Sequence, residues 1–168
     1  MKDARYFINH MNLQSHPEGG YFKETYRAAE FIAAEALPAR FEGERSFSTA
    51  IYYLLEQGAF SAFHRIKSDE CWHFYAGETL LIHVIENDGK YYCVKLGQDV
   101  VAGETFQFVV PATAWFAAEP AENTSFSLVG CTVAPGFDFT DFEMADQQTL
   151  LTKFPARKDV INRLCKNH

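Results

Sequence analysis

The sequence contains no long apolar run and no excess of positive charge. No apolar stretch approaches the roughly 20 residues that a membrane-spanning helix needs, and residues 1–6 lack the apolar segment of a secretion signal. The 15 Lys and Arg residues stand against 22 Asp and Glu residues, which gives a formal net charge of -7 without any basic run. These features disfavour nucleic acid and membranes as partners, and we expect a soluble, cytoplasmic protein.

Cysteine, glycine and proline are also scarce. The four cysteines, at positions 71, 93, 131 and 165, form no C-x-x-C pair that would indicate a zinc site or a dithiol redox motif, and each is expected to be a buried thiol. The 10 Gly and 6 Pro residues contrast with 16 Phe and 8 Tyr residues, whose rings require a large core. A chain of 168 residues without a linker is typical of one domain, and we treat 1–168 as a unit.

Short strand-like runs separated by turns occupy the middle of the chain. Asn87-Asp88-Gly89, between two such runs, is a strong hairpin signal. Turns recur about every 8 to 15 residues with no crossover helix between strands, which predicts an all-β antiparallel sandwich or barrel. After a first strand over 21–26, the predicted strands are 47–55, 59–66, 70–75, 80–86, 91–96, 105–109, 114–118 and 126–133.

Both ends of the chain have helical periodicity. Asp3 is a suitable cap for a short first helix that ends before His16, and the tail from about 146 to 166 is helical with a break at Pro155. Between barrel and tail, the Phe-rich residues 137–142 predict either an edge strand or a segment that lies across the barrel.

One spaced motif concentrates the residues capable of chemistry. Gly58, His64, Glu70 and Gly77 resemble the first motif of the cupin superfamily, in which Ile66 takes the place of a second histidine. Positions 64 and 66 share one face of a strand, and a turn returns Glu70 on the facing strand. Gly103, Pro111 and Phe116 resemble the second cupin motif, with Phe116 in place of its histidine and a longer gap from glycine to proline.

Four longer stretches are similar to one branch of this superfamily, the cupin-5 family of predicted sugar-epimerase-like proteins. They are 16–27 (HPEGGYFKETYR), 63–77 (FHRIKSDECWHFYAG), 109–118 (VVPATAWFAA) and 128–139 (LVGCTVAPGFDF), and Thr113 departs from the pattern where glycine is more usual. The resemblance implies a cupin double-stranded β-helix, or jelly-roll barrel, with short N-terminal and C-terminal helices. The barrel core would span about 16–143 and the helical tail about 146–166. The resemblance also implies a homodimer.

The motif residues leave a poor ligand set for a metal. Metal-binding cupins supply three histidines and a glutamate, whereas only His64 and Glu70 remain here. Two side chains are too few for a catalytic metal site, which normally has three protein ligands. We therefore expect no cofactor; a rebuilt set would need His73, which regular strand alternation directs to the opposite face from Glu70.

Three functional hypotheses follow. The first is a metal-independent epimerase or isomerase of a sugar or another polar metabolite, in which His64 removes a proton next to a carbonyl and Glu70 holds it. The second is a non-catalytic protein that binds a carbohydrate-like or mixed apolar ligand. The third is a metal-dependent cupin enzyme that uses His64, Glu70 and His73.

A set of apolar and basic side chains is predicted to contact the substrate or ligand. Aromatic walls stack on sugar rings, although ordinary core packing accounts for many such residues. Lys23, Glu24 and Arg27 could reach the barrel mouth and bind an anionic group, or be ordinary surface charges. The predicted contact residues are Ile66, Trp72, Phe74, Trp115, Phe116 and Lys23.

Four acidic residues cluster after the last barrel strand. Asp138, Asp141, Glu143 and Asp146 do not follow the spacing of a calcium loop, so a solvated acidic face is expected.

Overall fold

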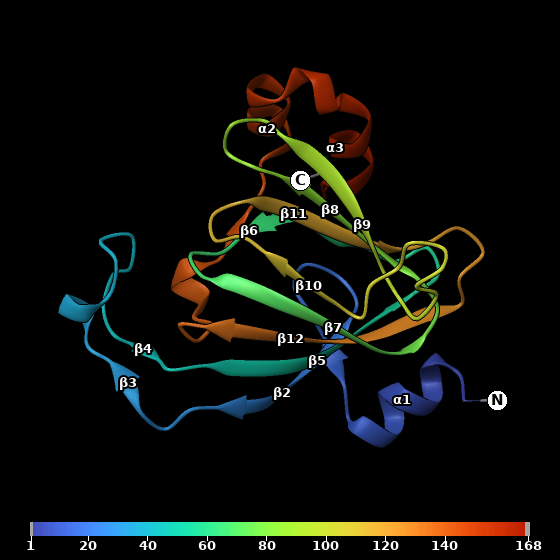
Figure 1. Ribbon diagram of the computed structural model, residues 1–168, viewed down its shortest axis with the longest axis horizontal. Helices are drawn as coiled ribbons and strands as arrows, with labels where there is room; N and C mark the ends of the chain where they lie inside the picture. The colour runs from blue at the N-terminus through green and yellow to red at the C-terminus, as the bar shows by residue number, and fades with distance from the viewer. Residues whose placement is uncertain (1, 167–168) are drawn as a thin grey trace.

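Two antiparallel sheets pack against each other to form a barrel in the computed structural model, which describes residues 2–166 (Figure 1). The six-stranded sheet comprises β1 (Gln14–Ser15), β2 (Tyr21–Arg27), β5 (Thr49–Glu56), β12 (Phe126–Ala134), β7 (Asp69–Gly77) and β10 (Gln107–Val110) in that order. The five-stranded sheet comprises β13 (Glu143–Met144), β6 (Ser61–Arg65), β11 (Trp115–Pro120), β8 (Leu80–Ile85) and β9 (Tyr91–Leu96). The predicted jelly-roll fold is confirmed.

Alternation along the strands separates the barrel interior from its outer faces. Ile82 and Val84 of β8 are fully buried in the core between the sheets, together with Trp72 and Val129 from the opposite sheet. The residues between them, such as His83, point outward, as expected for a side-chain period of two. The predicted hairpin at Asn87-Asp88-Gly89 joins β8 to β9, whose residues pair in register.

The helices cover two outer surfaces of the barrel. Helix α1 (Ala4–Met11) begins at Asp3, whose carboxylate accepts a hydrogen bond from the Tyr6 backbone N–H at 2.8 Å, which confirms the predicted cap. It packs on the six-stranded sheet through Phe7 and Phe126, whose ring centroids are 5.6 Å apart. Helices α2 (Gln147–Lys153) and α3 (Lys158–Leu164), joined by the short helix η3 (Pro155–Arg157), cover the five-stranded sheet.

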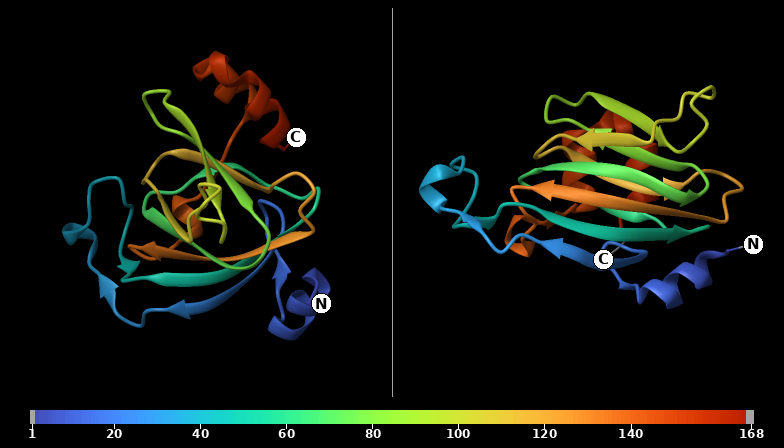
Figure 2. Two further views of the ribbon diagram at one scale, coloured as in Figure 1. Left: turned by 45° about the vertical axis from the view of Figure 1, so that its right-hand side comes forward. Right: turned by 60° about the horizontal axis from the view of Figure 1, so that its bottom comes forward.

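A long arm leaves the barrel between β2 and β5. It carries the two-stranded sheet of β3 (Phe31–Ile32) and β4 (Arg45–Ser46) and a short helix, η1 (Ala34–Ala36). Figure 2 shows the arm extending from the barrel on the side away from α1. Its return strand places Arg45 beside the segment that follows β12, where this arginine contacts Asp141.

Three sequence predictions are settled by local geometry. Residues 137–142 form no edge strand. They lie across the barrel and include the short helix η2 (Phe139–Asp141), as the second of the two predicted alternatives states. The prediction of four buried thiols holds for Cys131 and Cys165 but is wrong for Cys93, which is exposed on strand β9, and for Cys71, which is half-buried. Thr113 adopts a positive φ of 67°, which is the backbone region that favours glycine.

No helix among the described residues is long and apolar enough to cross a membrane.

Candidate functional site

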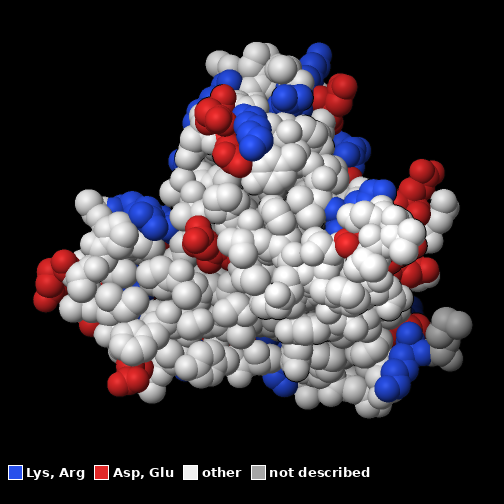
Figure 3. Space-filling view, in the orientation of Figure 1, with Lys and Arg blue, Asp and Glu red and all other residues white. Residues whose placement is uncertain are grey.

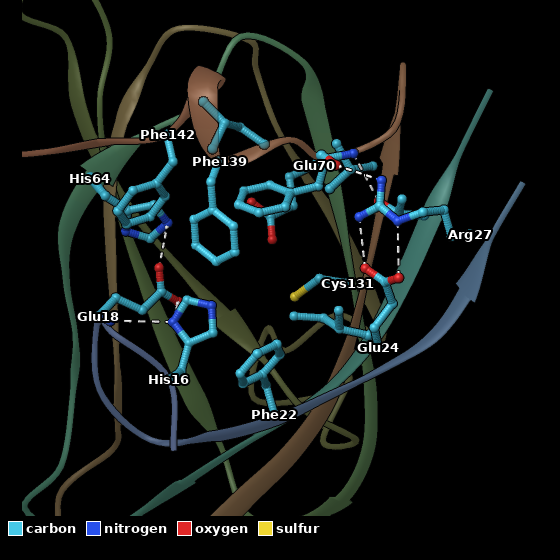
Figure 4. Close-up of a pocket in the computed structure, with 15 residues that line it drawn as sticks. His16, Glu18, Phe22, Glu24, Arg27, His64, Glu70, Cys131, Phe139 and Phe142 are labelled. Atoms are coloured by element: carbon cyan, nitrogen blue, oxygen red, sulfur yellow. Dashed lines mark hydrogen bonds and ion pairs between the residues drawn. The ribbon is translucent and has the colours of Figure 1, made fainter. Parts of the chain in front are cut away.

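One end of the barrel contains a cavity with a polar floor and a phenylalanine wall. The cavity has a volume of about 80 Å³, and the wider empty space between its lining residues, which is partly open to solvent, is about 620 Å³. Figure 4 shows His16, Glu18 and His64 grouped on one side of the cavity and Glu70 with Cys131 on the other. We refer to this space as the barrel cavity. Its polar side chains come from the loop that precedes β2 and from β2, β5, β6, β7 and β12.

The loop before β2 carries Glu18 into the barrel. Gly19 has a φ of 119°, and a Cβ atom there would lie only 2.1 Å from the Phe60 carbonyl oxygen, so no side chain can be accommodated. The Ala62 N–H donates to the Glu18 carbonyl at 3.0 Å, which anchors the loop to β6. Glu18 itself is 6% exposed. The Gly19-Gly20 pair thus lets the backbone approach closely enough to bury a carboxylate.

Glu18 pairs with His64 in the cavity floor. The Nε2 atom of His64 lies 3.0 Å from a Glu18 carboxylate oxygen, and its Nδ1 lies 2.7 Å from the Ala62 carbonyl oxygen. Because both partners only accept when Glu18 is ionised, both ring nitrogens must carry hydrogens, which makes His64 an imidazolium. Burial opposes the charge of each residue, but their mutual attraction and hydrogen bond prevail: the pKa of His64 is raised and the pKa of Glu18 is lowered.

His16 is a second histidine in the cavity, in the opposite protonation state. Its Nδ1 accepts a hydrogen bond from the Glu18 backbone N–H at 3.2 Å, so Nδ1 carries no proton. Burial is the main cause that lowers the pKa of His16, and the charge of His64 adds to it. The cavity therefore contains one charged and one neutral imidazole at neutral pH.

Glu70 faces these groups from strand β7. It is 7% exposed, and burial raises its pKa to about 7; the charge of His64 opposes the shift and that of Glu18 adds to it. The Cys131 thiol interacts with the carboxyl, and burial raises the pKa of Cys131 well above its usual value. A carboxyl with a pKa near 7 can accept and release a proton under physiological conditions.

Phenylalanine rings form the wall of the barrel cavity, which we call the aromatic wall. Phe137, Phe139 and Phe142 contact one another with centroid separations of 5.0, 6.3 and 6.1 Å, and Phe22 faces them from β2. The Phe142 ring also stacks on His64, with centroids 5.2 Å apart. This wall provides apolar contact area directly beside the polar floor.

A buried ion pair holds the aromatic wall in place. Arg45 donates two hydrogen bonds to the Asp141 carboxylate, at 2.6 and 2.7 Å, and both side chains are almost fully buried. The predicted solvated acidic face is therefore wrong for Asp141, because an arginine from the distant arm neutralises it. At the mouth, Arg27 donates to the Phe137 carbonyl oxygen at 3.0 Å and pairs with Glu24 through two hydrogen bonds.

Comparison with known proteins adds to this geometry. Residues 5–145 match the Cupin_5 family, described as Cupin superfamily (DUF985). The chain belongs to this family. The Cupin_5 chain is also 34% identical to the uncharacterized protein YML079W of Saccharomyces cerevisiae over 146 residues, which cover 80% of this chain and 71% of the yeast protein.

Solved structures of the same shape include two similar proteins. A hypothetical protein from Leishmania major is 34% identical, with a TM-score of 0.88 and coverage of 98% of this chain and 99% of that one. Protein SO0799 from Shewanella oneidensis is 39% identical, with a TM-score of 0.88 and full coverage of both chains. Oxalate decarboxylase from Bacillus subtilis, at 15% identity and a TM-score of 0.55, covers 92% of this chain and 37% of its own, and shares the fold.

Only some of the predicted site residues line the cavity of this Cupin_5 protein. His64, Glu70 and Ile66 line it, whereas Trp72 and Phe116 are buried in the core beneath, with Phe74 packed against that core. Trp115 belongs to the cluster under the C-terminal helices, and the Lys23 ammonium donates to the Met11 carbonyl oxygen outside the cavity. Neither Trp115 nor Lys23 lines the cavity, so a ligand there would not contact them.

The donor set of the Cupin_5 cavity does not fit a metal ion. Ile66 and Phe116 offer no ligand atom, and the Nε2 of His64 is occupied by Glu18. His73 lies on the outer face of β7, where its ring contacts Thr132 and Gln107, so it cannot join His64 and Glu70. No three His, Cys, Asp or Glu side chains among residues 2–166 are arranged to hold a metal.

Sequence reasoning missed several cavity residues. The carboxylate that pairs with His64 is Glu18 rather than Glu70, and His16 lies beside it. Both belong to the HPEGGYFKETYR stretch that carried the family resemblance. In this stretch, the Gly-Gly pair directly after Glu18 was the sequence feature that could have indicated a close backbone approach and a buried carboxylate. The other missed residues that line the cavity are Phe22, Thr49, Ile51, Cys131, Val133, Phe137, Phe139 and Phe142.

Proposed function

We propose that this protein is a metal-independent isomerase or epimerase of a sugar or another small hydroxycarbonyl compound. The observation that carries the proposal is the placement of Glu70 opposite the ion-paired His64 across an enclosed cavity. A proton-accepting carboxyl and an acid on the other side are the two groups that proton transfer next to a carbonyl requires.

The geometry favours roles that differ from those predicted from sequence. Glu70, as a carboxylate, accepts the proton from the carbon next to the carbonyl. The Nε2–H of the His64 imidazolium, which pairs with Glu18, must also be shared with the carbonyl oxygen of the bound substrate. Transfer of this proton to that oxygen gives a neutral enediol while Glu18 stays ionised. Glu70 then returns its proton to the neighbouring carbon and His64 recovers a proton from the second hydroxyl, which leaves all atoms and charges balanced.

The aromatic wall supports a substrate with an apolar face and a polar edge. A sugar ring or a short polyol chain presents C–H groups to phenylalanine on one side and hydroxyls to the polar floor on the other. His16 and the Glu18 carboxylate lie within the same cavity to orient such hydroxyls. The same wall would equally favour a non-catalytic protein that binds a mixed apolar ligand, which is the second candidate function.

Hydrogen exchange in D₂O tests the proposal. The purified protein is incubated with a panel of reducing sugars and hydroxyketones, and NMR follows loss of the C–H signal next to the carbonyl. We expect exchange with at least one compound and a loss of at least ~100-fold in Glu70→Gln.

Cys71→Ser provides a matched control for this experiment. It alters a half-buried thiol that is the next residue along β7 but lies on the outer face. Exchange at an unchanged rate in Glu70→Gln would refute the catalytic role. Ligand binding without any exchange, unaffected by Glu70→Gln, would favour the binding protein.

We also propose that the protein forms a homodimer through the outer face of the six-stranded sheet. The centre of this face carries few charges (Figure 3), and it includes Tyr75 and Val109, which are about half exposed. A broad uncharged sheet face matches the apolar centre of a two-fold interface. Light scattering coupled to size exclusion would give twice the chain mass, and Tyr75→Glu would return the monomer; a monomeric wild type would refute the dimer.

A further inference from the structure

A second histidine and carboxylate pair lies outside the barrel, beside α3. His83 of β8 is 4% exposed, and its Nε2 lies 3.1 Å from a carboxylate oxygen of Glu119 on β11. The same oxygen accepts a hydrogen bond from Arg163 of α3. Neither His83 nor Glu119 lines the barrel cavity, so this group plays no part in the function proposed above.

The partners of His83 determine which ring nitrogen has the lone pair that a base needs. The ionised Glu119 carboxylate can only accept, so Nε2 carries the hydrogen. Nδ1, which lies 2.9 Å from the Tyr91 hydroxyl, then retains its lone pair and accepts. A carboxylate that fixes the tautomer of a histidine in this way is the arrangement that prepares a general base.

Cys93 provides a nucleophile next to this base. It lies directly opposite His83 in the pairing of β8 with β9, and its thiol interacts with the imidazole. Unlike His83, Cys93 is exposed, because β9 is the outer strand of the five-stranded sheet. A thiol, a base and an orienting carboxylate therefore lie side by side on three adjacent strands, β9, β8 and β11.

Two cationic side chains lie near this thiol along β9, one over Tyr91, two positions before Cys93, and one two positions after it. The Arg157 guanidinium lies over the Tyr91 ring, 5.2 Å from its centroid, and makes no ion pair with any residue in 2–166. Its buried Nε also has no hydrogen-bond partner among these residues. Lys95 is exposed two positions along β9, on the same face as Cys93. These cations lie where an anionic reagent would approach the solvent-accessible thiol.

We propose that Cys93 is a reactive thiol, with His83 as its base, that forms mixed disulfides with small acidic disulfides of the glutathione type. His83 takes the proton from Cys93, and the sulfur attacks one sulfur of the disulfide. A new S–S bond forms as the old one breaks, and the second sulfur leaves as a thiolate that receives the proton from His83. Cys93 is oxidised and half of the reagent is reduced, so no further oxidant is needed.

Intact-mass spectrometry of the full chain with oxidised glutathione tests this site. The wild type should gain one glutathionyl group at Cys93, and Cys93→Ser should gain none. His83→Gln should react at least ~10-fold more slowly, because the base is lost. Cys71→Ser is the matched control, since it removes a thiol from the other sheet, and should react like the wild type.

The charge of the reagent separates a recognition site from a merely exposed thiol. Arg157→Gln should slow the reaction with anionic oxidised glutathione by ~3-fold or more and leave the reaction with cationic cystamine unchanged or faster. Glu119→Gln retains the shape of its side chain and should also slow both reactions, which keeps the test decisive if His83→Gln does not fold. Reaction of His83→Gln and Glu119→Gln at the wild-type rate, or an adduct that persists in Cys93→Ser, would overturn the proposal.

Discussion

The protein contains two buried histidine and carboxylate pairs of nearly equal length, one inside the barrel and one outside it. His64 lies 3.0 Å from Glu18 and His83 lies 3.1 Å from Glu119. The pKa of both histidines is raised against the effect of burial, by Glu18 for His64 and by Cys93 together with Glu119 for His83. Their remaining partners differ: a backbone carbonyl contacts the second nitrogen of His64, whereas a hydroxyl contacts that of His83.

This difference determines the chemistry available to each histidine. A carbonyl oxygen can only accept, so His64 is charged and can act as an acid. The Tyr91 hydroxyl can donate, so His83 can remain neutral and act as a base. Burial of the carboxylate differs as well, because Glu18 is enclosed whereas Glu119 is partly exposed and shared with Arg163. The following changes, from the largest expected effect to the smallest, test this comparison.

Burial of a carboxylate should have its greatest energetic effect at another buried ion pair, that of Arg45 with Asp141. Asp141→Ala leaves a buried guanidinium without its partner and should lower the free energy of unfolding by about 4 kcal/mol. The control is Glu143→Ala, whose partner Arg65 lies on the surface and whose loss should cost less than ~1 kcal/mol. Urea denaturation measures both, and equal losses would contradict the role of burial.

Replacing each histidine's partner should separate the two pairs. Glu18→Gln removes a fully enclosed charge from beside His64 and should lower the free energy of unfolding by about 3 kcal/mol. Glu119→Gln acts on a partly exposed carboxylate, and solvent screening limits its effect to less than ~1 kcal/mol. The same denaturation assay compares them; a larger loss in Glu119→Gln would reverse the comparison.

The pH dependence of stability should report Glu70 inside the barrel. Its pKa is about 7 in the folded protein against 4.5 as the ordinary value, so between these limits the folded chain holds a proton that the unfolded chain has released. Stability therefore falls as pH rises through this window and levels off above it. Glu70→Gln removes this pH-dependent loss. The difference in free energy of unfolding between Glu70→Gln and the wild type should therefore change by about 2 kcal/mol in favour of the variant from about pH 5 to pH 8. A difference that does not vary with pH would exclude the raised pKa.

NMR titration of the histidines gives the finest test. His64 and His83 should titrate above 6.5 and His16 below it. Glu18→Gln should shift the titration of His64 to lower pH and leave that of His83 unchanged, because His64 faces the barrel cavity and His83 lies on the outer face of the same five-stranded sheet. A joint shift of both would show that the pairs are coupled.

Much of the fold could be predicted because its signals are local. The Asp3 cap, the 87–89 hairpin and the strand alternation all depend on residues a few positions apart, and the structure confirms them. The burial of Ile66 and Phe116 likewise follows from their places in the spaced motifs.

The site could be predicted only in part, because its decisive pairs join distant positions. Glu18 reaches His64 across 46 residues, and Arg45 reaches Asp141 across 96. Spacing within a strand gives no information about such partners. For the same reason an acidic cluster near 141 resembled a solvated face, although an arginine from the arm neutralises its central member.

The buried Arg45 and Asp141 pair also has a consequence for ligand exchange. It fixes the segment with Phe137, Phe139 and Phe142 to the base of the arm, so the aromatic wall is preorganised before any ligand arrives. A ligand then loses little affinity to ordering the protein, and its residence time depends on the contacts in the cavity rather than on closure of a flexible lid.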